Sequence, residues 1–203
     1  TIILDRSGSM ETIKSATIES INSFLTAQKA AEMETSITLI QFDDQYEVLY
    51  EDQNIHQAKY LNQETYQPRG MTALLDAMGT TIKLTNKKLK NAKVKPDHVL
   101  LVIITDGEEN ASNKFKRSEI FQMIRKREQK NNWKFIFLAA NQDAIVEGQK
   151  YGIKAHQSLT FSHDKNGIID AVNSLSEKCF FSISKNEFND ICFNDEDRKK
   201  QER

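Results

Sequence analysis

The sequence predicts an α/β fold in three layers, doubly wound, with a mostly parallel central sheet and one antiparallel edge strand. Two observations carry this prediction. Short β-branched runs alternate with amphipathic segments, an order typical of repeated β–α–β units. The runs at 98–105 and 134–140 are apolar throughout, as expected of strands that helices cover on both faces. A length of 203 residues suits one domain with a full core.

The first half of the chain is expected to alternate strands and helices in a Rossmann-like order. A strand at 1–4 leads into a helix over about 12–31 with one apolar stripe. The strands at 36–42 and 46–50 are joined by so few polar residues that they can form only a hairpin, so one of them runs antiparallel. Its turn is assigned to Asp43 and Asp44. A helix over 73–89 follows.

The second half continues the alternation. The expected elements are strands at 98–105, 134–140 and 156–161 and helices over 118–129, 144–151 and 166–175. The predicted domain covers residues 1–178, with 179–203 as a C-terminal extension or final helix. Its charged end, 194–203, is expected to be disordered or a solvated helix end. Four phenylalanines are expected to join the core, with a docking patch as the alternative: Phe180, Phe181, Phe188 and Phe193.

Composition narrows the class of protein. Lys and Arg number 28 against 29 Asp and Glu, so the whole chain has no electrostatic preference for nucleic acid or an anionic membrane. No apolar run approaches the roughly 20 residues of a membrane span. Two cysteines, Cys179 and Cys192, are too few for a disulfide framework and indicate reduced thiols in the cytoplasm. Because the chain begins without Met, inside an apolar run, we expect a preceding segment.

Three loops at one predicted sheet edge carry oxygen ligands. Asp5, Ser7 and Ser9 follow the first strand, Asp106 follows the strand at 98–105, and Thr72 begins a helix. In doubly wound sheets, ligands bind beyond the carboxyl ends of the strands. Carboxylate and hydroxyl oxygens suit Mg²⁺, or Ca²⁺ or Mn²⁺, and make zinc a poor fit. With two carboxylates the cation is only just neutralised, so it would accept a further anionic ligand from outside.

The segments "DRSGSM", "GMTALLDA" and "ITDGEEN" in this order resemble the metal-ion-dependent adhesion site (MIDAS) of von Willebrand factor type A (vWA) domains, over roughly residues 1–160. The resemblance implies that Ser7 and Ser9 ligate the metal directly. Asp5 and Asp106 would be ligands or hold metal-bound waters, and Thr72 would bind directly or through water. It further implies a partner's Glu or Asp in the last position, and metal-dependent protein binding without catalysis. We expect bacterial or phage relatives inside the cell to be closer than extracellular adhesins.

Other interpretations of these residues exist. Asp5, Ser7 and Ser9 alone would suit a helix cap and turn. A serine hydrolase is disfavoured because "RSGSM" is not GxSxG and no histidine has a suitable context. The alternative of another class is a Mg²⁺-dependent phosphohydrolase with Asp5 as nucleophile, which Ser7 disfavours because that chemistry needs a second carboxylate there. The expected rim of the metal site is Arg6, Met10, Glu11, Arg69, Met71, Glu108 and Glu109, and helix capping is assigned to Asn141, Gln142 and Asp143.

Overall fold

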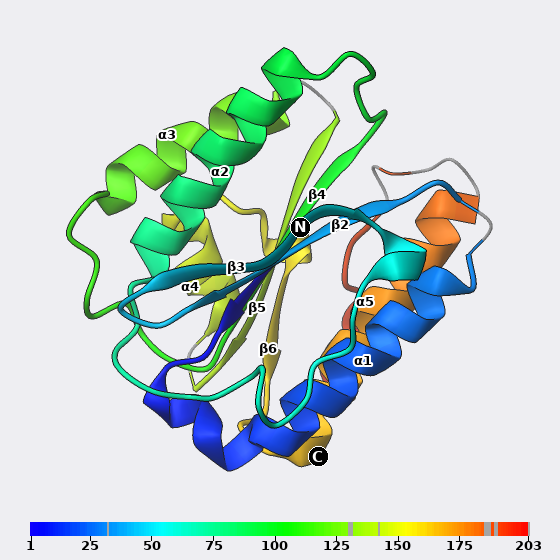
Figure 1. Cartoon of the computed structure of the whole chain (residues 1–203). Helices are drawn as coiled ribbons and strands as arrows, with labels where there is room; N and C mark the ends of the chain where they lie inside the picture. The colour runs from blue at the N-terminus through cyan, green and yellow to red at the C-terminus, as the bar shows by residue number, and fades with distance from the viewer. Residues whose placement is uncertain (32, 130–131, 142, 185–187, 189–190, 203) are drawn as a thin grey trace.

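The computed structural model describes residues 1–203 except 32, 130–131, 142, 185–187, 189–190 and 203. Within the described residues, strands and α-helices alternate along most of the chain (Figure 1). The strands are β1 (Ile2–Asp5), β2 (Ser36–Phe42), β3 (Tyr46–Asn54), β4 (Val99–Thr105), β5 (Trp133–Ala140) and β6 (Ser158–Phe161). The α-helices are α1 (Lys14–Lys29), α2 (Leu74–Asn91), α3 (Arg117–Glu128), α4 (Ala144–Lys150), α5 (Lys165–Ser184) and α6 (Asp195–Lys199). Short 3₁₀ helices are η1 (Gly8–Ile13), η2 (Ile55–Gln57) and η3 (Ala155–Gln157).

The strands form one six-stranded sheet in the order β3-β2-β1-β4-β5-β6. All neighbouring pairs are parallel except β2 and β3, which form the antiparallel hairpin at one edge. The three-layer fold with its antiparallel edge strand is therefore confirmed. Burial explains the arrangement, because every residue of β5 is buried whereas β3, with one face open to solvent, has no buried residue.

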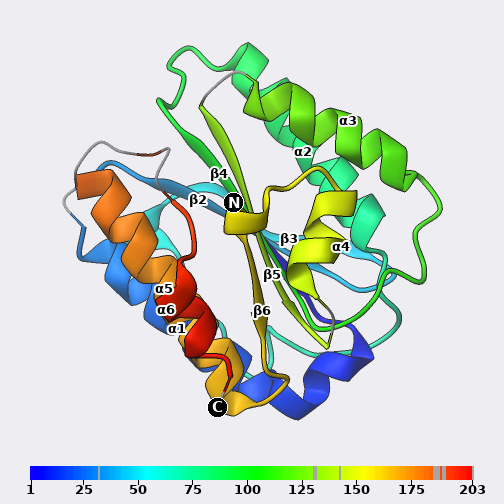
Figure 2. The same cartoon turned by 180° about the vertical axis from the view of Figure 1, so that it is seen from behind.

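Helices cover both faces of the sheet. Helices α2, α3 and α4 pack on one face, and α1 and α5 on the other (Figures 1 and 2). Successive residues of β1 alternate between the two cores: Ile2 and Leu4 face the α1 and α5 side, and Ile3 faces the α2 side. This alternation fixes which way Asp5 and the loop after it leave the sheet.

The chain after α5 includes a short final helix, one of the predicted alternatives. Asn194 accepts a hydrogen bond from Asp197 N and begins α6, whose Asp197 is 2% exposed and forms an ion pair with Lys178 on α5 (Nζ to Oδ2, 3.0 Å). Figure 2 shows α6 beside α5. The disordered alternative does not describe residues 195–199, which form a helix, and the solvated alternative fits its exposed residues but not the buried Asp197. Helix α5 crosses the 178/179 boundary, and where the domain ends stays a prediction.

The four C-terminal phenylalanines divide between the two interpretations. Phe188 and Phe193 are buried in the core on the α5 face, and Phe188 stacks on the ring of His98. Phe180 and Phe181 are 46% and 58% exposed. Cys179 and Cys192 are both free thiols. Of the helices that the structure describes, none has the length and apolar character needed to cross a membrane.

Candidate metal centre

Asp5 is fixed at the end of the central strand β1. Its side chain accepts hydrogen bonds at both oxygens, from Ser7 N at Oδ1 (2.6 Å) and from Thr105 Oγ1 at Oδ2 (2.5 Å). Its backbone carbonyl accepts another from the hydroxyl of Tyr66 (2.7 Å). These contacts hold the carboxylate, which is fully buried, at the edge where the neighbouring strand β4 also ends.

The two serines reach Asp106 from the turn that follows β1. The 3₁₀ helix η1 begins directly after Ser7 and curls the chain so that the hydroxyls of Ser7 and Ser9 lie 3.1 Å apart. Ser9 Oγ donates to Asp106 Oδ1 at 2.7 Å, across 97 residues of sequence. The predicted convergence of the β1 and β4 loops is thus present in the structure.

Thr72 completes the group from the loop before α2. Its backbone N donates to Asn110 Oδ1 (2.9 Å), and Asn110 N donates back to Thr72 O (3.0 Å), so the β4–α3 loop holds the Thr72 loop in place. A Cβ built on Gly107 would lie 3.2 Å from Thr72 Oγ1, 3.6 Å from Ser9 Oγ and 3.9 Å from Ser7 Oγ. The three hydroxyls therefore surround one small space, and the five predicted site residues come together.

Asp5 and Asp106 are both buried, and neither forms an ion pair with a Lys or Arg among the described residues. Burial raises the pKa of Asp5 to about 6, with the negative charge of Asp106 adding to the shift and the Thr105 and Ser7 hydrogen bonds opposing it. Asp106 Oδ2 is buried and accepts no well-aligned hydrogen bond, although His163 Nε2 lies 2.7 Å away. Such an arrangement of oxygens is completed chemically by a cation.

The donor set also limits the kind of metal. Among the described residues, no group of three or more His, Cys, Asp and Glu is placed to hold a metal ion. A cation at this edge of the sheet therefore depends on the hydroxyls of Ser7, Ser9 and Thr72. Mixed hydroxyl and carboxylate oxygens fit a hard divalent cation, as the sequence predicts.

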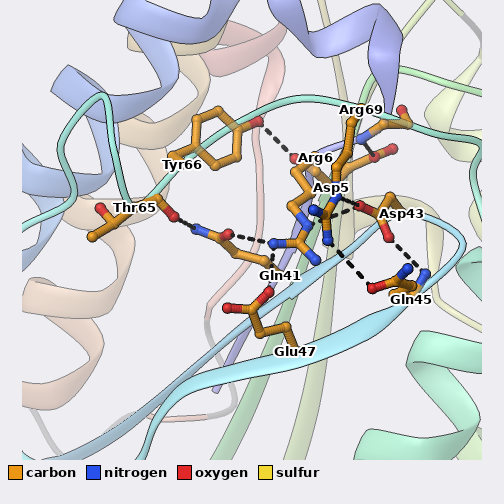
Figure 3. A network of polar contacts seen from close by, with 10 residues as sticks. Asp5, Arg6, Gln41, Asp43, Gln45, Glu47, Thr65, Tyr66 and Arg69 are labelled. Atoms are coloured by element: carbon orange, nitrogen blue, oxygen red, sulfur yellow. Dashed lines mark hydrogen bonds and ion pairs between the residues drawn. The ribbon is translucent and has the colours of Figure 1, made fainter.

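A buried polar network supports the loops that carry the site (Figure 3). Asp43 Oδ2 accepts hydrogen bonds from Arg6 Nε (3.0 Å) and Arg69 Nε (2.9 Å), and Arg6 Nη1 reaches Glu47 Oε2 at 2.7 Å. Asp43 lies in the β2–β3 turn as predicted, with Asp43 N donating to Gln45 O. Arg6 was expected at the rim, where it would attract an acidic ligand, but it is 5% exposed. Its guanidinium group forms ion pairs with Asp43 and Glu47, so the expectation that Arg6 lies at the rim was wrong.

Of the other residues expected at the rim of the metal site, some are buried or engaged elsewhere and others are exposed. Met10 is fully buried in the core between α1 and the sheet, and Glu109 caps α2 by accepting from Leu75 N (2.8 Å). Neither belongs to the rim. Met71 is 56% exposed and the Arg69 side chain 54%, which leaves both at the surface near Thr72. Glu11 and Glu108 are both exposed.

The loop after β5 combines capping with a contact to the site. Asp143 caps α4 by accepting from Ile145 N and Val146 N, as predicted. Asn141 adopts a left-handed φ of 55° and donates from Nδ2 to Asp106 O (3.3 Å), a role that capping does not describe. Gln142 lies outside the described residues. Sequence reasoning also missed Thr105, Asn110 and His163. Only Thr105 had a signal, because it directly precedes Asp106 in "TDG".

A methyl group at Gly107 is predicted to disturb the space that the three hydroxyls surround. We expect Gly107→Ala to weaken Mg²⁺ binding about tenfold or more, equivalent to about 1.4 kcal/mol. The matched control is Gly8→Ala, whose Cβ would meet Gly70 O at an ordinary 3.5 Å. Calorimetric titration with Mg²⁺ measures both variants. Equal losses in the two variants would contradict the placement of the cation beside Gly107.

Comparison with known proteins supports the fold described above. The sequence model of the von Willebrand factor type A domain matches residues 1–166. Solved structures with the same fold include a von Willebrand factor type A protein from Catenulispora acidiphila (TM-score 0.59, 13% identity, covering 88% of this chain and 42% of that one). A second is the manganese-loaded TRAP protein of Plasmodium vivax (TM-score 0.56, 15% identity, 83% and 68%).

A third similar structure is proximal thread matrix protein 1 from the mussel byssus, described with a zinc-occupied MIDAS motif (TM-score 0.59, 10% identity, covering 88% of this chain and 44% of that one). The chain thus spans less than half the length of the Catenulispora and mussel proteins. No curated protein sequence matches it. At these identities the likeness shows the fold alone.

Proposed function

Because the chain belongs to the von Willebrand factor type A family, whose domains generally mediate protein–protein interaction, we propose that it is a cation-dependent binding module with a complete MIDAS. The cation would be held by Asp5, Ser7, Ser9, Thr72 and Asp106. The observation that carries the proposal is that three hydroxyls and two buried carboxylates from three separate loops converge on one space.

The hydrogen bonds give each residue a role in the proposal. The hydroxyl of Ser9 donates a hydrogen bond to Asp106 Oδ1. A lone pair of the Ser9 oxygen is therefore available to a cation. Both oxygens of Asp5 already accept hydrogen bonds, from Ser7 N and Thr105 Oγ1. We infer that the hydroxyls are the direct ligands and that the carboxylates contribute charge, acting mainly through hydrogen bonds and bound water.

Mg²⁺ is the proposed ion, with Ca²⁺ and Mn²⁺ as alternatives. Oxygen ligands favour all three, and the related Plasmodium vivax structure is manganese-loaded. The mussel protein holds zinc at its site, so oxygen ligands by themselves do not reject zinc as strongly as the sequence argument assumes. Two carboxylates neutralise a divalent cation without excess, and a carboxylate from a partner protein would complete its shell. The proposed partner therefore presents a Glu or Asp.

Members of the family are mostly interaction modules without enzymatic activity. No feature of the site favours the phosphohydrolase alternative. The Asp5 carboxylate, its required nucleophile, is engaged at both oxygens by Ser7 N and Thr105 Oγ1. Attack on phosphorus would require one of these short contacts to break, and the position two residues on offers a hydroxyl where a general acid is needed.

Thr72→Val tests the proposal because it removes one hydroxyl and keeps the side-chain shape. Calorimetry with Mg²⁺ is expected to show binding by the wild type and a loss of about tenfold or more in the variant, about 1.4 kcal/mol. Thr85→Val on α2 is the matched control, since it lies about 16 Å along the helix from its first residue, Leu74. Immobilised wild type should then retain a protein partner in Mg²⁺ and release it in EDTA.

Two results would contradict the proposal. One is the absence of any heat of binding in the wild type with Mg²⁺, Mn²⁺ or Ca²⁺. The other is capture of the same partner by wild type and Thr72→Val in EDTA, which would show binding that does not use the cation.

A further inference from the structure

His163 lies beside the metal centre, although nothing in its sequence context connects it to the other site residues. It stands in the loop between β6 and α5, and its Nε2 is 2.7 Å from Asp106 Oδ2. The side chain is 22% exposed, and its other polar neighbour is Thr12 Oγ1 at 3.5 Å. The ring thus approaches the one carboxylate oxygen of Asp106 that Ser9 does not use.

Asp106 depends on this contact for its second oxygen. Its side chain is 0% exposed, Oδ1 accepts from Ser9, and Oδ2 accepts no aligned hydrogen bond within the described part of the chain. A buried carboxylate oxygen without a donor is costly and tends to turn towards any available one. Rotation of the Asp106 carboxylate would break the 2.7 Å bond from Ser9, which orients a proposed ligand.

His163 also separates Asp106 from a groove of about 400 Å³ on the surface. The groove is bordered by β6, by Asn141 and by the end of the chain after α6, and His163 lines it whereas Asp106 does not. Removing the imidazole would therefore open Oδ2 to water from the groove. Water can solvate the oxygen but cannot hold the carboxylate in one orientation. Loss of the imidazole should therefore weaken cation binding more than it lowers the stability of the fold.

We propose that His163 is a positioning residue of the metal centre: its Nε2, 2.7 Å from Asp106 Oδ2, restrains that oxygen and so keeps Oδ1 on Ser9 and the Ser9 oxygen directed at the cation. The inference rests on the proposed function. Groups that orient the ligands of a metal typically change its affinity 10–100-fold when they are removed. The imidazole acts here through Asp106 and is not itself a ligand.

Two substitutions test this role. His163→Ala removes the ring, whereas His163→Gln keeps an N–H donor at a similar reach. Calorimetry with Mg²⁺ is expected to show binding about tenfold weaker for His163→Ala and within about threefold of wild type for His163→Gln. The melting temperature of the metal-free His163→Ala protein should stay within about 3 °C of wild type, because groove water replaces the lost contact.

A spectroscopic readout separates positioning from direct ligation. With Mn²⁺ as the probe, pulsed EPR should show the same nitrogen couplings in the wild type and in His163→Ala. A coupling present in the wild type and absent from His163→Ala would mean that the imidazole binds the metal. Such a coupling would overturn the proposal. Unchanged Mg²⁺ affinity in His163→Ala would overturn it too, as would equal losses in His163→Gln and His163→Ala. A wild type that binds no divalent cation would instead remove the proposed function itself.

Discussion

Asp5→Asn is expected to abolish Mg²⁺ binding and, at the same time, to stabilise the metal-free protein at neutral pH. Asp5 is a buried carboxylate near a second one, Asp106, so its charge is unfavourable unless a cation is present. Asn removes that charge and keeps the side-chain shape. A residue retained for folding alone would behave in the opposite way, because its loss would weaken the fold.

The expected pH dependence follows from the direction of the shift. The pKa of Asp5 rises from 3.8 in the unfolded chain to about 6 in the folded protein, so between these values the folded state binds more protons. The free energy of unfolding of the metal-free wild type therefore receives a falling contribution as pH rises from about 4 to about 6. The difference between the pKa of Asp5 in the unfolded and folded states corresponds to roughly 3 kcal/mol in the free energy of unfolding. We expect a gain of about 1–2 kcal/mol in Asp5→Asn, since Asn makes weaker hydrogen bonds than a carboxylate.

Urea unfolding in EDTA from pH 4 to pH 8 measures this contribution, with calorimetry at pH 7.5 for the metal. Asp97→Asn, at an exposed carboxylate outside the site, is the matched control and should change neither quantity. A destabilised Asp5→Asn protein at pH 7.5, or one that binds Mg²⁺ like wild type, would show that Asp5 is not held in a charged state for a cation.

Much of the fold was predictable because it depends on local patterns. The apolar runs of β4 and β5 could only be buried strands, and the short turn at Asp43 required a hairpin. The site was predictable for a related reason. Parallel strands end at one edge, so Asp5 and Asp106 had to lie near each other once β1 and β4 were neighbours.

The features that the sequence did not predict depend on contacts between residues that are distant in sequence. Arg6 and Asp43 are 37 residues apart, and no local pattern distinguishes an arginine at a rim from one buried against a carboxylate. The same holds for His163, whose neighbour Asp106 lies 57 residues earlier, in the loop after β4. A final helix was among the alternatives for 179–203, but the burial of Asp197 on α6 was not predictable, because its partner Lys178 lies on another helix. Cytoplasmic location, bacterial or phage origin and the boundary at residue 178 stay predictions.

Asp43→Asn is expected to cause the largest loss of stability, about 3 kcal/mol in the free energy of unfolding. Asp43 is fully buried and accepts hydrogen bonds from Arg6 Nε, Arg69 Nε and Gln45 N. Asn cannot accept from both guanidinium groups without turning its own N–H₂ towards a donor. Arg6, only 5% exposed, would then keep a buried charge with Glu47 as its remaining ionic partner among the described residues.

Asp43 and Asp5 contribute to stability with opposite dependence on pH. Burial by itself would raise the pKa of Asp43, but the Arg69 and Gln45 hydrogen bonds and the charge of Arg6 outweigh it and hold the pKa below 3.8. Its stabilisation is therefore present above about pH 4 and is lost as pH falls through the lower folded value. Urea unfolding over a series of pH values should show wild type and Asp43→Asn well separated at pH 7, with the difference shrinking as pH falls below 3.8. Arg69→Gln, at a half-exposed partner of the same carboxylate, is the control and should cost far less. A difference that does not shrink at the lowest pH at which the wild type is still folded would mean that packing, and not the ionised network, makes Asp43 important.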